Sequence, residues 1–125
     1  MDEKTFKART KKLAVAIIKR MDKLPNSRAA DVIARQIIRS GTSIGANYRA
    51  ACRAKSTADM INKLKIVEEE ADETEYWLEI LAETGITSKE QVADIHKETD
   101  EILAMTVASI KTLRNRQSSI KNRKS

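Results

Sequence analysis

Arginine side chains recur at helical spacing across residues 28–53. When residues are placed about 100° apart, as on an α-helix, five arginines fall within one narrow arc opposite the face of Ile33, Ile37 and Ile44. A guanidinium group stays charged and forms paired hydrogen bonds with phosphate oxygens. The arc is therefore a candidate phosphate-binding face, although a row of charges is as commonly a solvated surface. Its members are Arg28, Arg35, Arg39, Arg49 and Arg53.

The end of the chain adds a second basic segment. Residues 102–125 contain six Lys or Arg and no Asp or Glu, and Ile120 is the one apolar residue after position 116. This composition predicts a disordered tail over residues 116–125 that is able to contact polyphosphate. The candidate phosphate ligands here are Arg114, Arg116, Lys121, Arg123 and Lys124.

Charge is sorted along the chain. Residues 1–55 carry 14 Lys or Arg against 4 Asp or Glu, whereas residues 56–101 carry 4 against 14. The formal net charge is +6, but the segregation predicts separate basic and acidic patches. An acidic stripe at helical spacing can pair with the arginines within one bundle or between subunits; it comprises Glu68, Asp72, Glu75, Glu79 and Glu83.

Few residues are suited to catalysis or metal binding. His96 is the sole histidine, and Ala93 stands where a Glu-x-x-His di-iron motif needs its carboxylate. Cys52, expected as a small buried residue, and His96 do not supply the roughly four ligands of a zinc site. Residues 40–46, Ser-Gly-Thr-Ser-Ile-Gly-Ala, lack the Gly-Lys-Ser/Thr of a phosphate loop. We therefore expect no catalytic residue, no metal and no cofactor.

Helices must position these residues. One proline and three glycines in 125 residues, with abundant Ala, Leu, Ile, Glu, Lys and Arg, favour helix and leave no strand pattern. Proline, glycine and capping residues at 24–27, 55–59 and 83–88 predict helices over roughly 4–23, 27–54, 57–83 and 89–115. Short loops between amphipathic helices of this length predict an all-α, antiparallel up-down four-helix bundle over residues 1–115.

Two features of this bundle concern helix contacts. Helix 57–83 has, besides its core seam, a second apolar face of Ile66, Trp77 and Ile80. That face is either covered within one bundle or is a subunit interface centred on Trp77, since aromatic residues are typical of interface centres. Gly41 and Gly45 lower helix stability, so we expect a close helix approach or a kink there.

The chain has no sequence feature that directs it to a membrane or an oxidising compartment. Its longest apolar run, Leu13 to Ile18, is six residues, far below the roughly 20 that span a bilayer. Lys19 and Arg20 end that run before any cleavage-like site, and a single cysteine allows no internal disulfide. We expect a cytoplasmic protein.

Two segments resemble a known family. They are residues 39–51, Arg-Ser-Gly-Thr-Ser-Ile-Gly-Ala-Asn-Tyr-Arg-Ala-Ala, and residues 63–78, which end in Glu-Thr-Glu-Tyr-Trp-Leu. Within residues 5–115 the chain is similar to the bacterial four-helix-bundle proteins encoded in intervening sequences of 23S ribosomal RNA genes. The resemblance implies an up-down bundle, a homopentameric ring, a nucleic-acid role and no catalysis. A distantly similar group, the accessory proteins of diversity-generating retroelements, implies binding to a reverse transcriptase and nucleic acid.

Two functional hypotheses follow. The first is a non-enzymatic oligomer that presents the arginine stripe and the tail to a nucleic-acid backbone, with RNA as the first candidate. Because aromatic residues make up only 3% of the chain, we expect recognition of backbone and shape rather than of bases. The alternative is a protein-interaction scaffold, such as an accessory subunit for a reverse transcriptase, in which the charged stripes pair between subunits.

Overall fold

The computed structural model describes residues 2–124, with side chains described for residues 2–122. It contains four α-helices: α1 (Glu3–Met21), α2 (Arg28–Cys52), α3 (Thr57–Glu83) and α4 (Lys89–Lys124). No strand occurs within residues 2–124, so the prediction of an all-α chain with four helices is confirmed. No helix in this range is long and apolar enough to cross a membrane.

The helix starts follow the capping residues in the sequence. Ser56 Oγ accepts a hydrogen bond from the Asp59 backbone N–H at 3.1 Å, and Asp59 Oδ2 accepts one from the Lys55 N–H at 3.1 Å. At α4, Ser88 Oγ accepts from the Gln91 N–H at 3.2 Å, while Gln91 Oε1 accepts from the Ser88 N–H at 3.0 Å. These reciprocal bonds satisfy backbone donors that a helix leaves unpaired at its first turn.

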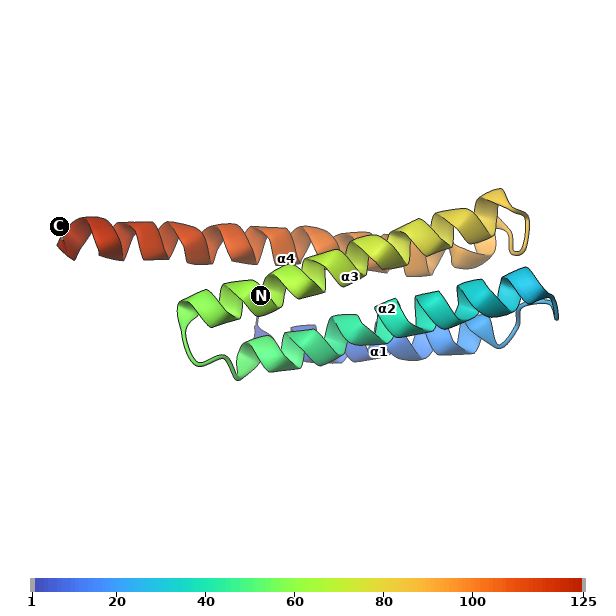
Figure 1. Ribbon diagram of the computed structural model, residues 1–125, viewed down its shortest axis with the longest axis horizontal. Helices are drawn as coiled ribbons and strands as arrows, with labels where there is room; N and C mark the ends of the chain where they lie inside the picture. Colours follow the sequence, from blue (N-terminus) through green and yellow to red (C-terminus); the bar gives the residue numbers. More distant parts are fainter. Residues whose placement is uncertain (1, 125) are drawn as a thin grey trace.

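The four helices share one core. Helix α1 packs on α2, α2 on α3, α3 on α4, and α4 on α1. Figure 1 shows the α1–α2 and α3–α4 turns at one end of the molecule and the α2–α3 turn at the other. The largest fully buried apolar side chains come from all four helices and lie on the predicted apolar faces: Phe6, Ile17, Ile37, Ile44, Leu64, Leu78, Leu81 and Ile102. Cys52 was expected to be buried but is half-buried, because it lies at the last residue of α2.

Helices α1 and α2 approach closely at two glycines. A Cβ atom on Gly41 would lie 2.5 Å from Ile17 Cδ1, and one on Gly45 would lie 3.1 Å from Thr10 Oγ1. Both contacted residues are buried, so neither can swing into solvent. The predicted close helix approach at these glycines is confirmed, and the contact compensates for the weak helix propensity of glycine.

Polar contacts join the other helix pairs. Arg9 of α1 holds two carboxylates of α4, with Nε to Glu98 Oε2 at 3.0 Å and Nη2 to Glu101 Oε2 at 3.2 Å. Hydrogen bonds from Arg9 keep the pKa of Glu98 below its usual value. Between α2 and α3, the buried Thr74 hydroxyl donates to Ser40 Oγ at 2.8 Å. These bonds fix which faces of the helices meet.

Helix α4 is longer than the sequence predicted. We expected a helix to residue 115 and a disordered tail over 116–125, but the helix continues to Lys124, and Ser125 lies outside the described residues. No glycine or proline follows Gly85, so nothing in the sequence stops the helix, and extending a docked helix requires no new nucleation. Helices α1 and α2 end two residues earlier than expected, at Met21 and Cys52.

We name residues 114–124 the α4 extension. Every side chain described in it, from 114 to 122, is exposed. Figure 1 shows the C-terminal part of α4 protruding past the α2–α3 turn. At 1.5 Å per residue, the extension is about 16 Å long.

Removing residues 117–125 is expected to leave the thermal unfolding midpoint nearly unchanged, because the described side chains of this segment are all exposed. Melting curves followed by circular dichroism would compare the full-length and shortened chains. As a positive control, Ile110→Ala should lower the midpoint by several degrees, since Ile110 is buried in the core. An equally large drop on shortening would mean that the extension packs on the bundle.

Candidate nucleic-acid interface

The five predicted arginines of α2 form one exposed face. Arg28, Arg35, Arg39, Arg49 and Arg53 are all exposed, on the side of the helix opposite its buried isoleucines. Among the side chains of residues 2–122, the ion pairs are made by Lys7 and Arg9 of α1, and none involves an α2 arginine. The α2 face therefore presents positive charge that no contacting carboxylate neutralises.

A shallow groove lies beside this face, between α1 and α2. It has a volume of about 420 Å³ and is lined by Thr10, Lys11, Ala14, Thr42, Gly45, Ala46, Arg49 and Arg53. The glycine and alanine residues keep its floor low, and three cations line it. The sequence prediction did not include Lys11, because only the packing of α1 at Gly45 brings it beside the α2 arginines. The small residues of α2, which predict a close helix approach, were the one sequence feature that could have indicated it.

The arginine face has a different environment at its α3 edge. Burial raises the pKa of Glu70 on α3, Glu73 raises it further, and Arg39 lowers it. Arg39 is thus within electrostatic range of an α3 carboxylate, although no ion pair joins them. Part of the charge of Arg39 is therefore offset within the chain.

The last two arginines of α2 and the basic residues of the α4 extension lie toward the same end of the molecule. Arg114, Arg116 and Lys121 are exposed on the α4 extension, which protrudes at the α2–α3 turn (Figure 1). Arg49 and Arg53 end α2 at that turn. Arg123 and Lys124 belong to the helix, but their side chains lie outside those described. The structure thus brings the C-terminal arginines of α2 and the extension to one end, whereas Arg28 lies at the far end of α2.

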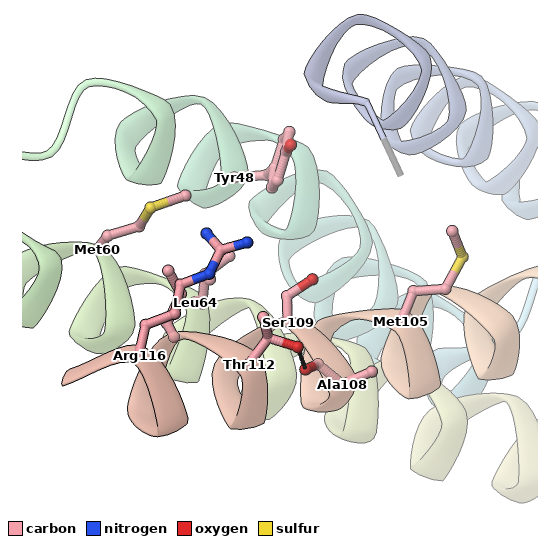
Figure 2. A pocket seen from close by; sticks show the side chains of 9 residues that line it. Tyr48, Met60, Leu64, Met105, Ala108, Ser109, Thr112 and Arg116 are labelled. Carbon is pink, nitrogen blue, oxygen red and sulfur yellow. Dashed lines mark hydrogen bonds between the residues drawn. The ribbon is translucent and has the colours of Figure 1, made fainter. Parts of the chain in front are cut away.

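A pocket of about 460 Å³ opens at this basic end, between α2, α3 and α4 (Figure 2). Figure 2 shows the Arg116 guanidinium reaching over the pocket between Met60 and Ser109. The Thr112 hydroxyl donates to the Ala108 carbonyl at 3.0 Å, so its hydrogen is used within the helix. Arg116 is the one charged side chain in the lining, which is completed by Tyr48, Leu64, Met105 and Leu113. No general acid and base pair is present in this pocket.

The described part of the chain also lacks a metal site. Within residues 2–122, no three side chains of His, Cys, Asp or Glu cluster to hold an ion. His96 is half-buried and lines a groove of about 640 Å³ between α3 and α4, which is rimmed by Glu79, Glu83 and Asp100.

The acidic stripe of α3 turns toward α4, away from the arginine face. Burial and a hydrogen bond with Asp100 of α4 raise the pKa of Glu75 to about 7. Glu79 and Glu83 border the groove on the same side. Among the described side chains, no ion pair links the acidic stripe of α3 to the arginine stripe of α2. Within one chain, therefore, these two stripes do not pair.

The second apolar face of α3 is only partly covered. Trp77 and Ile80 pack against the core, but Ile66 is 37% exposed and the neighbouring Tyr76 is 54% exposed. The rings of Tyr76 and Trp77 meet edge to face with centroids 5.1 Å apart. Trp77 Nε1 is shielded from solvent and has no acceptor among the described residues. Helix α3 packs on α2 and α4, and Ile66 is one of its two exposed large apolar side chains.

These features define a class of protein: a four-helix chain that carries separate basic and acidic faces and has no metal cluster in its described part. Within that class, the chain belongs to the 23S rRNA-intervening sequence protein family, whose model matches residues 4–108. The family resemblance predicted from the sequence is confirmed. The similarity to retroelement accessory proteins stays a prediction.

A solved structure gives a second comparison. It is a crystal structure of a protein with unknown function from the S23 ribosomal protein family from Bacteroides thetaiotaomicron VPI-5482. That protein is 43% identical to this chain, with a TM-score of 0.82, over 89% of this chain and 99% of the other. No curated protein matches the chain. The family match ends at residue 108, before the α4 extension begins.

The Glu75 carboxyl is expected to make stability depend on pH. Its folded pKa of about 7 lies above the ordinary 4.5, so the folded state holds the extra proton between these values. The free energy of unfolding contributed by this group therefore falls as pH rises through that window. Glu75→Gln should raise the melting midpoint at about pH 8 and have little effect at about pH 4.

Glu83→Gln is the matched control, since Glu83 is exposed on the same stripe and is not among the carboxylates that raise the pKa of Glu75. Its melting curves should follow those of the parent chain at each pH. If Glu75→Gln also follows the parent chain from acid to alkaline pH, the carboxyl does not hold the proton assigned to it.

Proposed function

We propose that the chain is a non-enzymatic, cytoplasmic, nucleic-acid-associated protein that binds the phosphate backbone. In this proposal it works as an up-down bundle assembled into a homopentameric ring. The observation that carries the proposal is the exposed arginine face of α2, which makes no ion pair with the described side chains. Such a face gains free energy from phosphates by releasing the condensed counterions of the nucleic acid.

The groove between α1 and α2 supports the same proposal. Lys11, Arg49 and Arg53 line a depression with a low floor of glycine and alanine, which suits a narrow anionic chain. Aromatic stacking platforms are missing from this surface, because Phe6 and Tyr48 pack against each other in the core at 4.4 Å between centroids. Binding through phosphates and shape is therefore favoured, and the family's description makes RNA the first polymer to test.

A protein-interaction scaffold, such as an accessory subunit of a reverse transcriptase, is the second candidate. Two observations favour it: the partly exposed apolar face of Ile66 and Trp77, and the electrostatic influence of Arg39 on Glu70. In that case the arginine stripe would pair with acidic stripes of neighbouring subunits, and nucleic acid would not be the ligand.

Oligomer formation is expected to depend on Trp77. Multi-angle light scattering after size exclusion should give about five times the 14.1 kDa of one chain, and Trp77→Ala should shift the protein toward lower mass. Val15→Ala is the control, because Val15 is an exposed apolar residue on α1. A parent chain that elutes at 14.1 kDa at micromolar concentration would contradict the oligomer.

Reversing charge on the α2 face separates the two candidate functions. In the variant Arg35→Glu, Arg39→Glu, Arg49→Glu, affinity for mixed-sequence RNA should fall by at least about tenfold at low salt. Helicity and oligomer mass should be retained, since the three side chains are exposed and opposite the core.

The matched control is Lys12→Glu, Lys19→Glu, Lys23→Glu, which makes the same charge change on exposed positions of α1 and beyond its end. It should weaken RNA binding far less. Loss of the oligomer in the arginine variant would favour the scaffold. Intact assembly with unchanged RNA affinity would refute the assignment of this face.

A further inference from the structure

The α4 extension is an addition to the bundle. The family model stops at residue 108, before the extension begins at residue 114. The side chains described in the extension are exposed, so they contribute no packing to the core. Their residue types must therefore be explained by something other than the stability of the bundle.

The extension has one neutral polar ridge between two basic flanks. At about 100° per residue, Asn115, Ser119 and Asn122 share one side of α4, opposite the direction in which Ile110 and Leu113 face the core. Arg114 and Lys121 lie together on one flank, about 100° from the ridge, and Arg116 lies on the other. In the sequence, Arg123 follows Arg116 at the same seven-residue spacing as Lys121 follows Arg114.

We propose that the α4 extension inserts into the major groove of duplex DNA and reads its sequence. The major groove, about 12 Å wide, admits an α-helix, and asparagine forms paired hydrogen bonds with the N6 and N7 atoms of adenine. Serine hydroxyls bond to several base edges. With the Asn115–Ser119–Asn122 ridge toward the bases, the basic flanks face the phosphates of the two strands. This inference rests on the proposed nucleic-acid function and names its ligand.

Other polyanions fit this arrangement less well. The major groove of A-form RNA is deep and narrow and excludes side chains, and single strands are recognised by stacking, for which the extension has no aromatic residue. A membrane-binding helix needs an apolar face, yet the extension has Ile120 alone. An acidic protein surface would use the flanks and leave the asparagines without a role. The expectation of backbone and shape recognition came from the scarcity of aromatic residues, which disfavours stacking on single strands but does not bear on hydrogen bonds to base edges in the major groove.

The test uses the full chain and a selection from random-sequence duplex DNA, with duplex and single-stranded RNA of equal length as comparison probes. The parent chain should enrich a short motif containing adenine. Asn115→Ala, Ser119→Ala, Asn122→Ala together should lower affinity for the enriched duplex by about tenfold or more, since one bidentate base contact is worth about that factor. Affinity for the unselected pool should hardly change, because the flanking cations remain.

The matched control is Gln117→Ala, which changes a polar residue on the side of the extension opposite the ridge and should preserve the enriched motif. Three results would overturn the inference: no motif is enriched, the ridge variant enriches the same motif as the parent, or poly-glutamate displaces the enriched duplex as readily as the unselected pool.

If the ridge variant behaves like the parent while the α2 arginine variant loses RNA binding, only the inference fails. If the parent binds none of the probes at low salt, the proposed function fails with it.

Discussion

Helices α1 and α2 come within side-chain contact of each other's backbone at Gly41 and Gly45, and this approach decides which faces remain for function. The Ile17 and Thr10 side chains occupy the space where a Cβ would stand, so the two helices have one stable rotation relative to each other. That rotation turns the isoleucines of α2 inward and its arginines outward. It also places Lys11 beside Arg49 and Arg53, so the basic groove is a direct consequence of the packing.

The electrostatics of the bundle follow from the same arrangement. Arginines on the outer side of α2 and carboxylates on the α4 side of α3 stay apart, so neither stripe neutralises the other within the chain. Burial and the neighbouring Asp100 raise the pKa of Glu75 to about 7, so this carboxyl holds a proton below that pH, whereas the arginines stay charged. An exposed row of permanent cations attracts polyanions at a distance, and this long-range field is the property that the proposed function uses.

Much of the fold was predictable because its signals are local. The apolar period of residues 28–53 identified the core residues Ile33, Ile37 and Ile44, and the capping residues at 55–59 marked where α3 begins. The site was harder, because it depends on contacts between helices. Lys11 joins the groove only through α1–α2 packing. The Glu75–Asp100 pair joins α3 to α4 through two residues that are 25 positions apart in the sequence. The α4 extension could not be predicted from composition, because a basic segment poor in apolar residues is typical of disorder, whereas the absence of Gly and Pro after Gly85 lets the docked helix continue.

The proposed function is binding of nucleic acid through unpaired cations on one face and one end of the bundle. The most direct measurement is the affinity of the parent chain for a mixed-sequence RNA and a mixed-sequence duplex DNA across a salt series. If cations bind the phosphates, the logarithm of affinity falls linearly with the logarithm of salt concentration, with a slope of about 0.7 to 0.9 per phosphate contact and several such contacts in total. Binding that is independent of salt, or no binding to either polymer at low salt, would contradict it.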